Sequence, residues 1–178
     1  MIKAELQLAA LETRHKFSQS LGFYLMGVSG NPEAQEQKAF VKCLMAEFPI
    51  ELGEIEIPNK KTPHMPDIIY RSLIVATADF IGAGKYKGSA MQNFNAMGYQ
   101  KGTLDVTIMY PASGYHGFTC EMKCPGGHYT KSGKIGKPGK PTREQILTID
   151  WRNMQGYYAC VGMGFSGALG HWLTYLGK

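Results

Sequence analysis

The chain has 178 residues, 44% of them hydrophobic, which suits one domain with its own core. Its 19 Lys and Arg exceed its 14 Asp and Glu, and the net charge of +5 favours an anionic partner. Membrane-spanning and disulfide-stabilised classes are excluded, since no apolar run approaches roughly 18 residues and the 4 cysteines lack a framework spacing, so we expect a soluble, cytoplasmic protein with reduced thiols.

The first predicted element is a helical arm within residues 1–30. It is rich in helix formers with an imperfect amphipathic pattern, so it either packs on its own domain or pairs two copies. A second helix begins at Asn31, an N-cap residue followed by proline and then an acid, and extends to about Phe48. By position alone that acid, Glu33, complements the helix dipole.

A strand is predicted over residues 52–58. Asn59, Lys60 and Lys61 follow this strand directly. The two lysines are either solvated or in contact with a nucleic acid backbone. The mostly apolar stretch 67–81 predicts a helix. A short polar helix is predicted over 88–98.

Two predicted strands, 103–110 and 117–123, form the centre of the chain. Side chains alternate along a strand, so the apolar residues of both strands share one face, and Asp105, Glu121 and Lys123 share the other. Pairing through a turn at 111–114 would put Asp105 beside Glu121. We expect the charged face to line a cleft.

Such a pair of carboxylates is typical of a metal site. The two acids repel each other unless a cation lies between them, and oxygen ligands suit Mg²⁺ or Mn²⁺. Lys123, two residues beyond the second acid, can then reach a water nucleophile or a phosphate that gains negative charge. The pattern favours phosphodiester chemistry, and the alternative is an ordinary hairpin with a solvated Glu/Lys pair.

The loop 128–141 is rich in glycine, proline and lysine, and a loop of this length is usually functional or disordered. From Lys123 to Arg143 the chain has only basic charged residues. We predict that they contact phosphates, so that binding weakens steeply with salt. The candidate DNA contacts of the whole chain are Asn59, Lys60, Lys61, Lys101, Lys131, Lys134, Lys137, Lys140 and Arg143.

The last predicted elements are a helix from about Arg143 to Met154, a strand over 157–163 and a closing helix over 167–176. Gln145 lies in the first turn of the earlier helix, where an exposed glutamine is ordinary. The order of elements predicts one α/β domain over 31–178, with a small mixed sheet flanked by helices. No dinucleotide-binding glycine pattern occurs, so no nucleotide cofactor is expected.

A zinc site is a weaker alternative. His116, Cys120, Cys124 and His128 recur every four residues. However, Cys120 should face the core if Glu121 faces the cleft, and the usual C-x-x-C knuckle is missing.

Several short motifs follow one another in a fixed order: EAQEQ at 33–37, IPN at 57–59, GTLD at 102–105, GYHGFTCEMKCPGG at 114–127 and GYYA at 156–159. Over about residues 31–170 this series resembles the VRR-NUC domain, the virus-type replication-repair branch of the PD-(D/E)xK nucleases. The chain departs from that family at Leu104, where proline is usual, and over residues 62–87, which by this comparison form an insertion with its own helix. Pro66-Asp67 spells the Pro-Asp of such nucleases, but no acid-x-Lys follows it before Glu121.

The resemblance implies a PD-(D/E)xK restriction-endonuclease-like core and roles for particular residues. Asp105, Glu121 and the backbone carbonyl of Met122 would hold the metal ion. Glu33 would lie in or just outside the ligand shell, with Glu36 as its rival.

The resemblance also implies a role for two further side chains. Lys123 would stabilise or activate the attacking water, and Gln145 would orient that water or Lys123.

The implied activity is that of an Mg²⁺- or Mn²⁺-dependent DNA endonuclease that leaves a 5′-phosphate and a 3′-hydroxyl. Members of this size resemble homodimeric proteins of bacteria and phages that act on branched DNA such as four-way junctions. The alternatives are a non-catalytic DNA-binding module of the same fold, an exonuclease or a nicking restriction-type nuclease. The insertion would serve as a substrate wedge, a lid or a dimer surface.

Overall fold

The structure is a computed structural model that describes residues 32–62, 64–76, 102–127 and 134–178. Its helices and strands in chain order are α3 (Pro32–Glu47), β1 (Glu54–Ile57), β2 (Asp67–Tyr70), β3 (Leu73–Val75), β4 (Val106–Ile108), β5 (Phe118–Lys123), α6 (Arg143–Met154), β6 (Tyr158–Met163) and α7 (Gly164–Tyr175). The arm predicted within 1–30 and the helix predicted over 88–98 lie outside the described residues. Within those residues, no helix is both long and apolar enough to cross a membrane.

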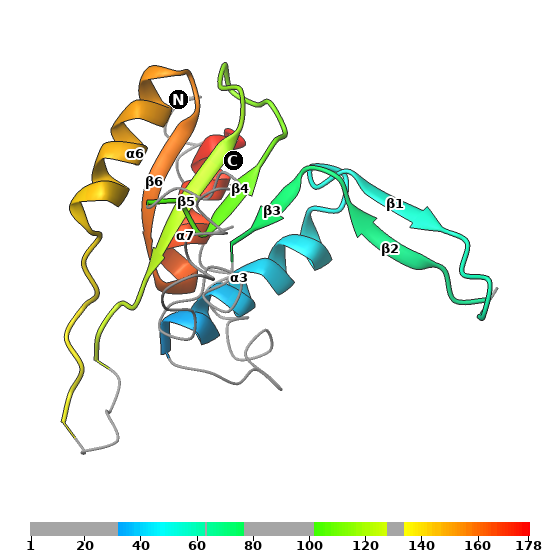
Figure 1. Cartoon of the computed structure of the whole chain (residues 1–178), viewed down its shortest axis with the longest axis horizontal. Helices are drawn as coiled ribbons and strands as arrows, with labels where there is room; N and C mark the ends of the chain where they lie inside the picture. The colour runs from blue at the N-terminus through cyan, green and yellow to red at the C-terminus, as the bar shows by residue number, and fades with distance from the viewer. Residues whose placement is uncertain (1–31, 63, 77–101, 128–133) are drawn as a thin grey trace, which may run out of the picture.

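A mixed four-stranded sheet with the order β3-β4-β5-β6 forms the centre of the fold (Figure 1). β3, β4 and β5 pair antiparallel, whereas β5 and β6 pair parallel. A parallel pair needs a crossover connection, and α6 supplies it here. The sheet and its flanking helices confirm the predicted α/β fold with a small mixed sheet.

The hydrophobic core lies between the sheet and helices α3 and α7. The predicted apolar face of β4 and β5 is fully buried and comprises Val106, Ile108, Phe118, Cys120 and Met122. The ring of Trp172 in α7 packs edge-on against the rings of Phe118 and Phe48, at centroid distances of 5.3 and 5.7 Å. This packing fixes β5 from one side, and therefore also fixes the direction of the side chains on its other side.

A glycine lets α7 lie directly on the sheet. A Cβ atom at Gly162 would stand 2.7 Å from the Cβ of Ala168 and 2.8 Å from the Sγ of Cys120. Such distances are too short for non-bonded atoms, so no larger residue fits at position 162 without a shift of its neighbours. The four cysteines are buried and unpaired by disulfides, as predicted from their apolar surroundings.

Helix α7 begins at Gly164, earlier than the predicted 167, because α3 supplies its N-terminal cap. The N-cap residue Met163 has no capping side chain. Instead, Oε2 of Glu36 accepts a hydrogen bond from the backbone N–H of Phe165 at 2.7 Å. A carboxylate also complements the positive end of the helix dipole.

Replacing this cap should weaken the fold. We expect Glu36→Ala to lower the free energy of unfolding by about 1–2 kcal/mol, since the Phe165 N–H loses its acceptor. Urea unfolding followed by circular dichroism measures the change. The exposed acid Glu56 offers the control, because Glu56→Ala should cost less than about 0.5 kcal/mol. Equal losses in the two variants would contradict the capping role.

The helix predicted over 67–81 is wrong for the residues that the structure describes. β2 and β3 occupy this stretch and pair with β1 and β4. The apolar run Leu73–Val75 is rich in branched residues, which pack well in a sheet, and pairing with β4 overrides the weak helical pattern. Residues 77–81 lie outside the described residues.

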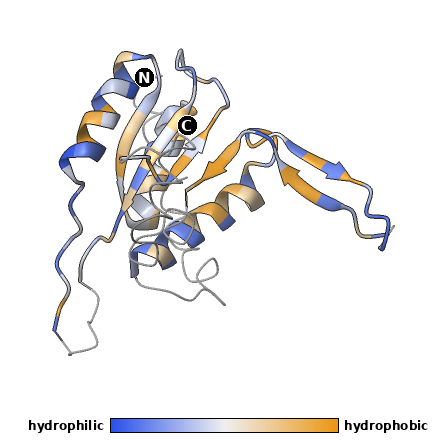
Figure 2. Ribbon diagram, viewed as in Figure 1, coloured by the Kyte–Doolittle hydropathy of each residue, from blue (hydrophilic) through white to orange (hydrophobic). Residues whose placement is uncertain are grey.

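β1 and β2 form a two-stranded arm that extends from the body of the molecule (Figure 1). Figure 2 shows hydrophobic residues on both of its strands. Ile55, Ile57 and Ile68 keep 44, 39 and 49% of their surface exposed. The arm therefore presents apolar surface that the described part of the chain leaves uncovered.

Candidate active site

The pairing of β4 with β5 brings the first two acids together. Val106 lies opposite Cys120, so Asp105 lies opposite Glu121 in the same antiparallel register. Oδ2 of Asp105 accepts a hydrogen bond from the backbone N–H of Met122 at 2.7 Å. The predicted position of Asp105 beside Glu121 is therefore confirmed.

Glu121 and Lys123 point to the same side of β5, and they form an ion pair. Nζ of Lys123 lies 2.5 Å from Oε1 of Glu121. Only 1% of Glu121 and 8% of Lys123 is exposed, so the alternative of an ordinary hairpin with a solvated Glu/Lys pair is wrong. β5 is an inner strand of the sheet with a helix against this side, and the two charges lie inside the protein.

Helix α3 contributes Glu33 from its first turn. Oε1 of Glu33 lies 3.6 Å from Nζ of Lys123, and Oε2 accepts the backbone N–H of Cys124 at 3.2 Å. Its rival Glu36 instead caps α7. Among the two candidates on α3, the structure therefore places Glu33 in the site.

Helix α6 contributes Gln145, whose side chain both caps the helix and contacts Glu121. Its Oε1 accepts the backbone N–H of Thr142, and Thr142 Oγ1 accepts the backbone N–H of Gln145, so the pair forms a capping box. Its Nε2 donates a hydrogen bond to Oε1 of Glu121. The start of α6 and the orientation of the buried carboxylate thus depend on one side chain.

If Glu121 is a metal ligand, as its residue type suggests, Gln145→Ala should reduce any activity of the site by about 10- to 100-fold, the usual cost of losing a group that orients such a ligand. Thr142→Ala is the control, because it removes the other half of the capping box but keeps the amide on Glu121. It should cost about 1 kcal/mol of stability and much less activity. Similar rates in the two variants would show that Gln145 acts only as a cap.

The charges in the site do not balance. Burial, and next the charge of Asp105, raise the pKa of Glu121 to about 7, although Lys123 opposes the shift. Burial is also the main reason why the pKa of Asp105 is raised. Burial lowers the pKa of Lys123, but the hydrogen bond to Glu121 and the nearby carboxylates outweigh it, and the pKa is raised overall. One ammonium group lies near three carboxyl groups here, so a further cation would bring the charge of the site closer to neutral.

The oxygen atoms of the site fit a hard metal ion. Oε2 of Glu121 is buried and has no hydrogen-bond partner among the described residues. An orphaned carboxylate oxygen beside a second carboxylate is a donor set that suits Mg²⁺ or Mn²⁺. In the described part of the chain no group of three His, Cys, Asp or Glu side chains could hold one metal ion. Glu33 therefore does not complete a three-carboxylate ligand set, because it contacts Lys123 and Cys124 instead.

The lack of such a group among the described residues also argues against the zinc alternative. Cys120 is buried in the core, where its thiol lies near Cys160. His128 lies outside the described residues. The described candidates for zinc ligands do not come together.

The predicted DNA contacts fall into separate groups. Lys134, Lys137 and Lys140 are exposed on the segment that leads into α6, and Arg143 is exposed at the first position of α6. Gly139 of this segment lies against Lys123 in the site. Lys60 and Lys61 lie at the tip of the β1–β2 arm, away from the sheet (Figure 1). Lys101 and Lys131 lie outside the described residues.

Asn59 has a local role in the arm. Its Oδ1 accepts the backbone N–H groups of Lys61 and Thr62, and its Nδ2 donates to Asp67. These bonds stabilise the turn after β1. The structure therefore does not bring Asn59 to the site.

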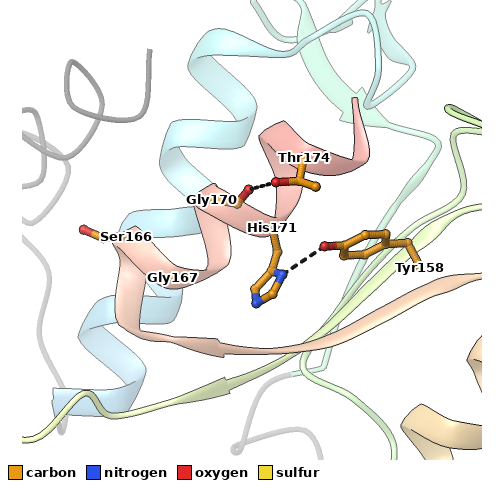
Figure 3. A pocket seen from close by; sticks show the side chains of 6 residues that line it. All are labelled: Tyr158, Ser166, Gly167, Gly170, His171 and Thr174. Carbon is orange, nitrogen blue, oxygen red and sulfur yellow. Dashed lines mark hydrogen bonds between the residues drawn. The ribbon is translucent and has the colours of Figure 1, made fainter. Parts of the chain in front are cut away.

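Two features beside the sheet were not predicted. Gly139 packs against Lys123 and Glu33, and the glycine at every third position of this lysine-rich loop was the available signal. A hollow of about 390 Å³ also lies between β6 and α7 (Figure 3). Oη of Tyr158 lies 3.0 Å from Nδ1 of His171 there. None of the predicted site residues lines this hollow, and nothing in the sequence pattern indicated it.

Comparison with known proteins agrees with this architecture. A solved structure described as a VRR_NUC domain protein aligns with a TM-score of 0.50 and 16% sequence identity, over 84% of this chain and 91% of the other. No protein-family model and no curated protein matches the sequence. Identity this low shows the fold alone. The chain therefore has a fold similar to that of this VRR_NUC domain protein, which agrees with the resemblance seen in the sequence motifs.

Proposed function

We propose that this protein is a divalent-metal-dependent DNA endonuclease that hydrolyses phosphodiester bonds in branched DNA. The observation that carries the proposal is the cluster of the half-buried Asp105 with the buried Glu121 and Lys123, in which one carboxylate oxygen of Glu121 has no hydrogen-bond partner among the described residues. The nuclease-like fold supports the same conclusion.

Asp105, Glu121 and the backbone carbonyl of Met122 would hold the Mg²⁺ or Mn²⁺ ion. When bound, such an ion lowers the pKa of a coordinated water and neutralises charge on the phosphate. Gln145 holds Oε1 of Glu121 and leaves Oε2 free for a ligand role. Glu33 is a positioning residue, because its carboxylate lies against the Lys123 ammonium.

Lys123 supplies the positive charge at the reacting phosphate. Its ammonium would stabilise the negative charge that develops as water attacks phosphorus. The bond from phosphorus to the 3′-oxygen breaks, and that oxygen takes up a proton. The products are a 5′-phosphate and a 3′-hydroxyl.

The branched substrate and the homodimer belong to the same proposal. Cutting a four-way junction needs two incisions, which two copies supply. The net charge of +5 favours DNA. The apolar surface of the β1–β2 arm supports a dimer, because a second copy would cover it. Sedimentation of the purified protein measures the oligomeric state, and a monomer throughout the accessible concentration range would contradict the dimer.

Cleavage of labelled DNA tests the proposal. Four-way junction, flap, single-stranded and linear duplex substrates are incubated with Mg²⁺, Mn²⁺ or EDTA. We expect incision at the branch with either metal and none with EDTA. Cutting of linear but not circular DNA would indicate an exonuclease. Binding of branched DNA without any cleavage would indicate a non-catalytic DNA-binding module.

A further inference from the structure

The segment that leads into α6 is an extended chain that runs back beside the end of β5 (Figure 1). The backbone N–H of Gly127 donates to the carbonyl of Gly136 at 3.0 Å, and that of Gly139 donates to the carbonyl of Cys124 at 2.9 Å. The two contacts are three residues apart on both sides, so they belong to one antiparallel register. We call residues 134–143 the cationic limb.

The sequence of the cationic limb explains its extended form. Pro138 and Pro141 have a fixed φ, and each restricts the lysine before it to the extended region. In a polyproline II chain three residues complete a turn, so residues three apart share a side. Lys134, Lys137 and Lys140 have this spacing and are exposed, and the exposed basic series continues at Arg143, the first residue of α6.

A second of the three sides of the cationic limb lies against the candidate site at Gly139. Gly136 and Gly139, also three apart, make the backbone contacts to the other segment. A Cβ atom at Gly139 would lie 3.3 Å from Cδ of Lys123 and 3.3 Å from Oε2 of Glu33. The glycine therefore lets the limb touch Lys123, and the row of cations passes directly beside the site.

We infer that the cationic limb binds the phosphate backbone of a DNA duplex arm and holds it in register with Lys123. The inference rests on the proposed nuclease function, and it specifies that the limb binds the duplex arm of the substrate. A duplex is favoured over a single strand, because the limb has no aromatic side chain on which bases could stack. Contacts to phosphates alone also make the binding independent of base sequence.

The length of the limb predicts the length of DNA that it covers. Lys134 and Arg143 are nine residues apart. At about 3.1 Å per residue this distance is about 28 Å, which corresponds to about eight base pairs at 3.4 Å each. We expect affinity to rise with duplex length up to about that number of base pairs beside the branch and then to level off.

The salt dependence of binding gives the sharpest test. Each phosphate contact contributes about 0.9 to the slope of log K against log salt for a duplex, so losing three contacts lowers the slope by about 2.7. Between about 50 and 200 mM salt the wild type should therefore lose about 40-fold more affinity than a variant without them.

The variant is Lys134→Gln/Lys137→Gln/Lys140→Gln, and its matched control is Lys38→Gln/Lys42→Gln/Lys178→Gln, which removes as many exposed lysines elsewhere. Anisotropy with labelled duplex and single-stranded DNA in EDTA measures binding without cleavage. We expect the slope to fall only in the first variant, and single strands to bind less tightly than duplexes of the same length.

The outcomes separate this inference from the proposed function. Three results would overturn the cationic limb's role, even if the wild type cleaves DNA. They are an unchanged slope of log K against log salt in the first variant, an equal fall of that slope in the control, and tighter binding of single strands than of duplexes. Conversely, duplex binding that depends on the limb, without cleavage in any metal, would leave the inference standing and refute the nuclease proposal.

Discussion

Asp105→Asn should reduce metal-dependent cleavage by about 10³-fold, because it removes a charged ligand whose loss costs several kcal/mol of transition-state stabilisation. Lys123→Ala should cost about 10²–10³-fold, the usual effect of removing one group that stabilises developing charge. Duplex binding should survive both changes, since the cationic limb is intact. Single-turnover cleavage of a labelled junction, with binding measured in EDTA, checks both statements.

Asp67 offers a matched control for the first substitution. It follows Pro66, as in the literal nuclease signature, but it lies at the start of β2 and bonds to Asn59. Asp67→Asn should therefore leave the cleavage rate nearly unchanged. If it abolished cleavage while Asp105→Asn did not, the site would have been assigned to the wrong acid.

Glu121 should make the metal-free protein less stable as the pH rises. Its pKa is about 7 in the folded protein, against 4.5 for an ordinary glutamate side chain. Below pH 4.5 the group is protonated in both states and contributes nothing. Above pH 7 it is ionised in both, and the folded state bears a penalty of about 3 kcal/mol, at 1.36 kcal/mol per pKa unit. Stability is therefore lost between these two values.

Urea unfolding in EDTA at several pH values measures this loss. Glu121→Gln keeps the shape of the side chain but cannot ionise, so we expect a flatter pH dependence than in the wild type. Mg²⁺ or Mn²⁺ should restore stability above pH 7 to the wild type and not to the variant, because binding to the folded state stabilises it. Parallel pH profiles for the two proteins would refute the assignment.

The alternation of side chains in the sequence determined much of the site. The pattern in 103–110 and 117–123 separates Asp105, Glu121 and Lys123 from the apolar residues of the same strands, and the short turn between the strands puts Asp105 opposite Glu121. The start signal at Asn31 and Pro32 likewise predicted helix α3, and helix α6 was predicted with its observed bounds. These are local properties, because they depend on residues that are close in the chain.

Only the tertiary structure decided which of the two acids on α3 belongs to the site. Both Glu33 and Glu36 lie near the start of the helix, and the position of α7 makes Glu36 a cap and leaves Glu33 against Lys123. The contact of Gly139 with Lys123 has the same character, since it joins segments that local rules do not relate.

Pairing with other strands also decided the secondary structure of residues 67–75, which the local pattern assigned to a helix. The short apolar runs of β2 and β3 suit either structure, and their partners in β1 and β4 select the sheet. Burial of the charged face of β5 came from neighbours on both sides and from α6. The sequence by itself thus determined which side chains share a face, whereas the tertiary structure decided what covers that face, because covering it requires segments far apart in the chain.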